Sequence, residues 1–228
     1  MNEPLWRRVS AEFLGSLLLA GVVIGSGVMA TRLSAGNNAI ALLANTGATA
    51  AILYVLIAAL GPISGAHLNP AVTLVAMLRG ELALPGALAY MIVQVAGCVA
   101  GAMLAHAMFE LPLLQTGTHV RAGFSQALSE GVGAFALVFA ILFVSRARKQ
   151  ALPAAVALTI AAGYWWTAST SFANPAITIA RAMSDTFAGI RPQDAPAFIA
   201  AQFAGALAAM VVGAALAPGR TSGSVTTP

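Results

Sequence analysis

Charged residues are scarce in this chain of 228 residues, which contains 8% Asp, Glu, Lys and Arg against 59% hydrophobic residues. A mean hydropathy of +0.86 excludes an ordinary soluble globular domain. The basic excess is small, with a formal net charge of +4. With so few charges, this excess is better explained by orientation in a membrane than by nucleic-acid binding. We therefore expect a lipid bilayer as partner and no nucleic acid.

Cysteine and clustered metal ligands are also lacking. The single cysteine, Cys98, excludes an internal disulfide and any metal site built from cysteines. It lies in an apolar run, where a buried thiol is inert. No nucleophile–base pair and no set of metal ligands occurs at a usable spacing. The sequence therefore predicts neither an enzyme nor a bound cofactor or metal.

Long apolar runs are abundant, and a bilayer crossing takes about 20 residues. Two shorter apolar pieces fall below that length and fit half-helices that enter the membrane from opposite sides. The expected spans are 9–31, 40–60, 84–109, 125–146, 152–169 and 195–217, and the expected half-helices are 69–78 and 174–184. This pattern predicts an all-α membrane protein with six transmembrane helices and two re-entrant half-helices.

One short phrase occurs twice, as Asn69-Pro70-Ala71 and Asn174-Pro175-Ala176. Asn is a strong N-cap, and Pro suits the first helical position, where its missing N–H is not needed. Both phrases therefore read as helix starts. Within a membrane, such a helix start is tolerated only where it lines a cavity, and interrupted segments at matching places in two halves indicate a transport site.

Further pairs of segments support an internal repeat. Glu12 and Glu130 lie near the starts of the first and fourth spans, and Gln94-Val95-Ala96-Gly97 matches Gln202-Phe203-Ala204-Gly205. Three spans per half require the second half to be inverted relative to the first. We expect a single domain, residues 1–228, with halves of about 1–118 and 119–217, followed by a disordered tail at 218–228.

The basic residues predict the orientation. Most of them fall on one side of this topology: Arg7, Arg8, Arg79, Arg146, Arg148, Lys149 and Arg220. Arg32, Arg121 and Arg191 fall on the other side. The positive-inside rule then places both termini in the cytoplasm. Gly97 and Gly101 form a small-xxx-small pair that lets two helices approach closely.

Two half-helices that meet at their Asn-Pro-Ala starts would place two positive dipole ends at the bilayer midplane. Cations and protons are repelled there, while Asn69 and Asn174 offer amide donors to a neutral solute. Glu12 and Glu130 are carboxylates within spans, either a proton relay or structural acceptors for free N–H groups beside the half-helices. Their matched positions favour the structural role. His67, at a pore mouth, either bonds to nearby backbone or contacts the solute.

These residues resemble those of the major intrinsic protein family, the aquaporins and aquaglyceroporins. The resemblance is carried by the run from Ser64 to Thr73, the second Asn174-Pro175-Ala176, the two glutamates and the six-span inverted layout. It implies a homotetramer with one pore per subunit that conducts small neutral solutes and water passively. It also implies that Asn69 and Asn174 meet in mid-pore.

The chain departs from the family where an arginine usually follows the second Asn-Pro-Ala phrase, because Ile177 stands there. Counting back from the two phrases places the other filter positions at Thr49, Ala162 (or its neighbour Gly163) and Ser171. These side chains are small or unable to donate, so a wide and weakly polar filter is expected. Thr178 stands where glycerol facilitators usually carry Asp.

Arg181 lies one turn beyond Ile177, and helical side chains lean toward the N-terminus of their helix. Its guanidinium could reach back over Ile177, form an ion pair with Asp185 at i+4, or do both. The stretch from Asn174 to Arg181, with Asp185-Thr186-Phe187-Ala188-Gly189, resembles bacterial aquaporins associated with arsenic resistance. That resemblance implies a bacterial inner membrane and passage of neutral trivalent metalloid hydroxides such as arsenous acid, which is about glycerol-sized.

The expected function is thus a passive channel for small uncharged polyols or metalloid hydroxides and for water. An ordinary water-selective aquaporin or a glycerol facilitator is the alternative. A proton-coupled carrier that uses Glu12 and Glu130 is a remoter one.

Overall fold

The computed structural model describes residues 3–216, and within that range the chain is helical with no strand. In chain order the helices are α1 (Leu5–Leu33), α2 (Asn38–Ser64), α3 (Pro70–Leu78), α4 (Leu84–Met108), α5 (Phe124–Ala147), the short 3₁₀ helix η1 (Lys149–Ala151), α6 (Leu152–Trp166), α7 (Pro175–Ala182) and α8 (Ala195–Ala215). The six spans and two half-helices predicted from the sequence are all present, with ends that shift by a few residues. The predicted disordered tail at 218–228, with Arg220, lies outside the described residues.

Five helices in the described range, α1, α2, α4, α5 and α8, are long and apolar enough to cross a membrane. Helix α6 has 15 residues, and η1 precedes it directly. The protein is therefore an integral, multi-pass helical membrane protein. The half-helices α3 and α7, of 9 and 8 residues, are too short to span.

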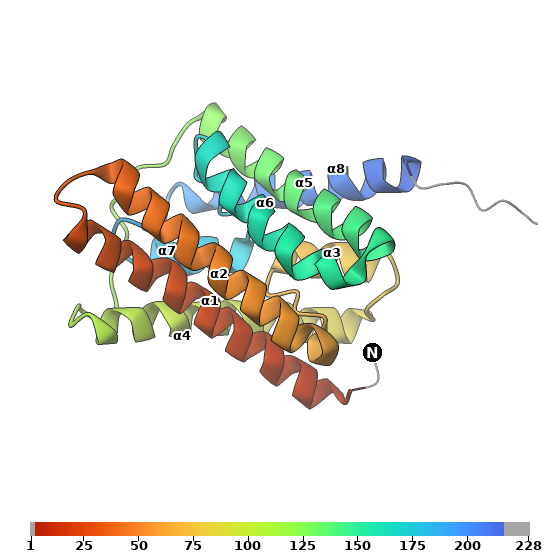
Figure 1. Cartoon of the computed structure of the whole chain (residues 1–228). Helices are drawn as coiled ribbons and strands as arrows, with labels where there is room; N and C mark the ends of the chain where they lie inside the picture. Colours follow the sequence, from red (N-terminus) through yellow and green to blue (C-terminus); the bar gives the residue numbers. More distant parts are fainter. Residues whose placement is uncertain (1–2, 217–228) are drawn as a thin grey trace, which may run out of the picture.

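Two groups of helices surround the half-helices (Figure 1). Helix α1 packs on α2 and α4, and α5 packs on α6 and α8 in the same pattern. The groups meet where α2 contacts α6, while α3 reaches across to α8 and α7 reaches across to α4. Each half-helix is therefore held by both halves of the chain.

Glycines allow the close packing within each group. A Cβ atom on Gly97 or Gly101 of α4 would collide with the backbone of α1, and one on Gly205 of α8 would collide with Gly131 of α5. The close approach predicted for Gly97 and Gly101 is confirmed. Such contacts suit a membrane, where helices associate through van der Waals packing rather than by escaping water.

Candidate functional site

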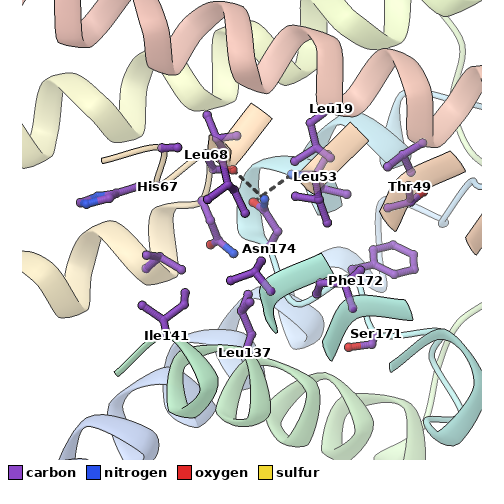
Figure 2. A pocket seen from close by; sticks show the side chains of 18 of the residues that line it. Leu19, Thr49, Leu53, His67, Leu68, Leu137, Ile141, Ser171, Phe172 and Asn174 are labelled. Carbon is purple, nitrogen blue, oxygen red and sulfur yellow. Dashed lines mark hydrogen bonds between the residues drawn. The ribbon is translucent and has the colours of Figure 1, made fainter. Parts of the chain in front are cut away.

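A cavity of about 220 Å³ lies between the two groups of helices, at the place where the half-helices meet. Its walls are mostly apolar, with Leu19, Val23, Leu53, Leu137, Ile141 and Val156 among them. The polar side chains that line it include Thr49, His67, Asn69, Tyr164, Asn174 and Arg181. Figure 2 shows Asn174 between these walls, with His67 toward one end and Thr49, Ser171 and Phe172 toward the other.

Asn69 and Asn174 each cap their own half-helix and bond to the loop before the other one. The Oδ1 atom of Asn69 caps α3 by accepting from the N–H of Ala71, and Oδ1 of Asn174 caps α7 by accepting from Ala176. The Nδ2 atom of Asn69 donates to the carbonyl of Ala173 at 2.7 Å, and Nδ2 of Asn174 donates to that of Leu68 at 2.8 Å. Each amide has two N–H donors, so one remains to face the cavity.

The loops before the half-helices have the same unusual backbone. Ala66 and Leu68 have φ of 47° and 49°, and Ser171 and Ala173 have φ of 49° and 49°. Residues other than glycine rarely adopt this left-handed region, and each such residue costs about 1–3 kcal/mol unless the surroundings hold it. The strain recurs at matching positions 105 residues apart, which is the separation of Asn69 and Asn174, so the surroundings must hold both loops in the same way.

Glu12 holds the first of these loops. Its carboxylate is fully buried and accepts from the hydroxyl of Ser64 and the backbone N–H of His67 on one oxygen. The other oxygen accepts from the backbone N–H of Leu68 and from Nε2 of Gln94, both at 2.7 Å. Four donors, two of them backbone N–H groups of the strained loop, thus converge on one carboxylate.

Glu130 holds the second loop with the equivalent four donors. Oε1 accepts from Ser169 at 2.5 Å and from the N–H of Phe172 at 2.8 Å. Oε2 accepts from the N–H of Ala173 at 2.9 Å and from Gln202 at 2.6 Å. Neither glutamate lines the cavity. This geometry supports the structural role for both carboxylates over the proton relay.

His67 lines the cavity and is also anchored from behind. Its Nδ1 atom lies 3.1 Å from the hydroxyl of Thr73 on α3, and its ring packs edge-on against Tyr90. The ring thus bonds to a side-chain hydroxyl rather than to nearby backbone, while it also borders the cavity, where a solute can contact it.

Three of the predicted filter positions, Thr49, Ser171 and Ile177, line the cavity. Ala162 does not, since it is an exposed residue on the outer side of α6. Tyr164 lines the cavity in its place. Residues two positions apart in an α-helix differ by about 200° around its axis, so residues 162 and 164 point to nearly opposite sides. The expectation that Ala162 lines the cavity is therefore wrong, and Tyr164 is the α6 residue at this place.

Tyr164 makes this end of the cavity bulkier than the small residues predicted for it. Its hydroxyl lies 3.2 Å from Oγ1 of Thr49, a hydrogen bond that joins α6 to α2 across this end of the cavity. Counting along α6 for its buried face would have found this residue, because Val156, Ile160 and Tyr164 recur at i, i+4 and i+8.

Arg181 lines the same end of the cavity as Ile177 and is 2% exposed. Its guanidinium carbon lies 3.3 Å from the centre of the Phe172 ring, and Nε donates to the carbonyl of Ala188. The ion pair with Asp185 is not formed in the described part of the chain. Asp185 instead accepts from the N–H and the hydroxyl of Thr118, at 3.1 and 2.6 Å.

Gly163, the alternative filter position, lies behind Ser171 and sets its place. A Cβ atom on Gly163 would stand 2.7 Å from Cβ and 2.8 Å from Oγ of Ser171. Gly163→Ala is therefore expected to displace Ser171, which lines the cavity, and to slow glycerol-sized solutes several-fold, with a loss of stability of about 1–3 kcal/mol.

Stopped-flow swelling of proteoliposomes and thermal unfolding measure both effects. Gly47→Ala on α2 is the matched control, because a Cβ atom added to Gly47 would have no neighbour within 4 Å. Equal glycerol flux in Gly163→Ala and the unaltered protein would show that Ser171 does not border the narrow region.

Comparisons with known proteins agree with this architecture. The family model described as "Major intrinsic protein" matches residues 1–165. The aquaglyceroporin AqpS of Rhizobium meliloti (strain 1021) is 54% identical over 208 residues, which cover 91% of this chain and 89% of AqpS. Human aquaporin-1 is 33% identical over 176 residues, covering 72% of this chain and 65% of that protein. The X-ray structure of the aquaglyceroporin from Plasmodium falciparum superposes with a TM-score of 0.68 at 20% identity, covering 91% of this chain and 95% of that one.

Proposed function

Because the chain belongs to the major intrinsic protein family, we propose that it is a passive channel for water and for small uncharged solutes, including glycerol-sized polyols and trivalent metalloid hydroxides such as arsenous acid. Members of this family are channels and not enzymes. Similarity to an aquaglyceroporin over most of the chain supports the passage of solutes larger than water.

Ile177 is the observation that carries the wider substrate range. It follows the second Asn-Pro-Ala phrase directly, is 5% exposed and lines the cavity. An apolar side chain at that position cannot donate a hydrogen bond, so it binds neither a water molecule nor a solute hydroxyl in this way. The donors at this end come instead from Arg181, one turn further along α7, and from the hydroxyls of Thr49 and Tyr164.

Tyr164 narrows the filter but also suits polyols. Its ring is apolar and its hydroxyl is polar. A polyol has carbon atoms on one side and hydroxyls on the other, so it can contact both parts of this side chain. Leu19, Leu53, Leu137 and Ile141 continue the apolar wall toward mid-pore (Figure 2). A solute with both kinds of surface is thereby favoured over an ion.

The two half-helices supply the barrier to cations. The N-termini of α3 and α7 meet where Asn69 and Asn174 bond across to each other's loops. The positive ends of both helix dipoles therefore point at the middle of the cavity, where the mostly apolar walls leave their charge weakly screened. This geometry requires no charged gate at the centre.

Swelling assays in proteoliposomes test the proposal. We expect permeability to water, glycerol and arsenous acid, each insensitive to a protonophore because a passive channel equilibrates its solute whatever the proton gradient. Water permeation with exclusion of both larger solutes would support an ordinary water-selective channel instead. Solute uptake that collapses with the protonophore would favour the carrier built on Glu12 and Glu130.

The assembly and location also follow as proposals. We infer a homotetramer with one pore per subunit, in a bacterial inner membrane with both termini in the cytoplasm. The basic residues Arg7, Arg8, Arg146 and Lys149 gather at one end of the spans and support this orientation.

A further inference from the structure

Arg181 is a buried cation without a carboxylate partner in residues 3–216. The ion pairs in that range join Arg7 with Glu3, Arg79 with Glu81, and Arg191 with Asp194. A buried charge is expensive unless it is paired or hydrogen-bonded. The contacts of Arg181 therefore indicate which kind of group could stabilise its charge.

The contacts of Arg181 leave its terminal nitrogens available. Nε donates to the carbonyl of Ala188, and the guanidinium lies over the Phe172 ring. Neither Nη1 nor Nη2 has a hydrogen-bond partner in the described chain. Neither belongs to the polar atoms that are both fully buried and unpaired, so both retain some exposed surface. Since Arg181 lines the cavity, its two terminal nitrogens face open space there.

A second arginine adds positive charge at the same place. Arg121 stacks on the same Phe172 ring, with its guanidinium carbon 5.1 Å from the ring centre. Its side chain bonds to the carbonyls of Gly189 and Ser169, both neutral acceptors. Two guanidinium groups thus flank one aromatic ring at one end of the cavity.

The nearby aspartates are occupied by other donors. Asp185 accepts from Thr118, and Asp194 pairs with Arg191 at 2.8 Å while accepting from the backbone N–H of Arg121. His119, in the loop before α5, is affected by the positive charge of the two arginines. Its pKa is lowered by partial burial first and then by the charges of Arg121 and Arg181, against a smaller opposing effect of Asp185.

We propose that the Arg181 end of the cavity holds an anion-binding site, in which the two terminal nitrogens of Arg181 donate to a small planar oxyanion such as a carboxylate or nitrate. Two parallel N–H donors of a guanidinium match two oxygens of such a group. Arg121, whose guanidinium lies over the same Phe172 ring, adds to the attraction. The site binds at the mouth, and the apolar wall beyond it opposes passage of the charged ligand. This inference goes beyond conduction, and binding does not depend on the channel's solute range.

Calorimetric titration of the purified protein with sodium formate, at constant ionic strength and pH 7, tests the site. We expect saturable binding that weakens about tenfold or more in Arg181→Gln, the loss expected for charge-assisted hydrogen bonds. Arg32→Gln is the matched control, because Arg32 also stacks on a ring, that of Phe109, and lies away from the cavity lining. Absence of saturable binding, or equal affinity in Arg181→Gln, would overturn the proposal.

A second measurement tests the site without the Arg181→Gln variant, in case that variant does not fold. An anion beside Arg181 offsets the positive field at His119, so formate should raise the pKa of this imidazole, followed by NMR in the unaltered protein. A His119 pKa that does not respond to formate contradicts the site. Swelling with glycerol, run on the same preparation, reports the channel independently of either result.

Discussion

Glu130→Gln is expected to destabilise the folded protein by about 2–5 kcal/mol. The carboxylate accepts from four donors, and two of them are the backbone N–H groups of Phe172 and Ala173. The glutamine amide keeps one acceptor oxygen and replaces the other with an NH₂ group. Whichever way it turns, one buried backbone N–H then faces a donor and loses its partner.

This loss is a large fraction of a typical stability of about 5–15 kcal/mol. Ala173 also accepts the bond from Nδ2 of Asn69 through its carbonyl, so a displaced loop moves the Asn69 amide as well. Thermal unfolding in detergent should show a markedly lower midpoint, and the surviving protein should conduct less solute per folded molecule.

Two controls separate the structural role from a proton relay. Glu12→Gln should destabilise to a similar degree, because Glu12 holds His67 and Leu68 in the same way. Glu110→Gln should have little effect, since Glu110 is exposed beyond α4. A Glu130→Gln protein that unfolds like the unaltered one but loses proton-dependent uptake would support the relay.

The fold could be predicted from the sequence because its largest signals are local. Apolar runs mark the spans, and each Asn-Pro pair marks a half-helix start where Asn caps and Pro occupies the first turn. The pairing of Glu12 and Glu130 with the loops also followed from their matched positions. Such features depend on residues near one another in sequence or on the repeat itself.

The lining of the cavity could be predicted only in part, because it depends on how separate helices are rotated. Thr49, Ser171 and Ile177 were placed correctly at the cavity by spacing, whereas on α6 the same counting chose Ala162, nearly opposite to Tyr164. The two alternatives for Arg181 could not be separated either. Asp185 was in range at i+4, but its oxygen accepts hydrogen bonds from Thr118, which is 67 residues away in sequence.

Ile177→Arg is expected to lower the permeability to glycerol and arsenous acid about tenfold or more, with a smaller effect on water. Ile177 lines the cavity, and the longer side chain reduces the free cross-section there. A permeation barrier raised by about 1.36 kcal/mol slows a solute tenfold, and we expect the added bulk to raise the barrier for the two larger solutes by at least that much. Swelling assays with the three solutes measure the change in selectivity.

Ile177→Leu is the size-matched control and should leave all three permeabilities close to those of the unaltered protein. The new arginine also lies four residues before Arg181, and like charges at that spacing repel. The double variant Ile177→Arg with Arg181→Gln removes this repulsion while keeping the added bulk. If glycerol and arsenous acid still cross the double variant at the original rate, Ile177 does not border the narrowest part of the pore. If both slow while water passes, the residue after the second Asn-Pro-Ala phrase sets the size limit, because bulk alone has then separated solutes that share the same uncharged hydroxyl chemistry.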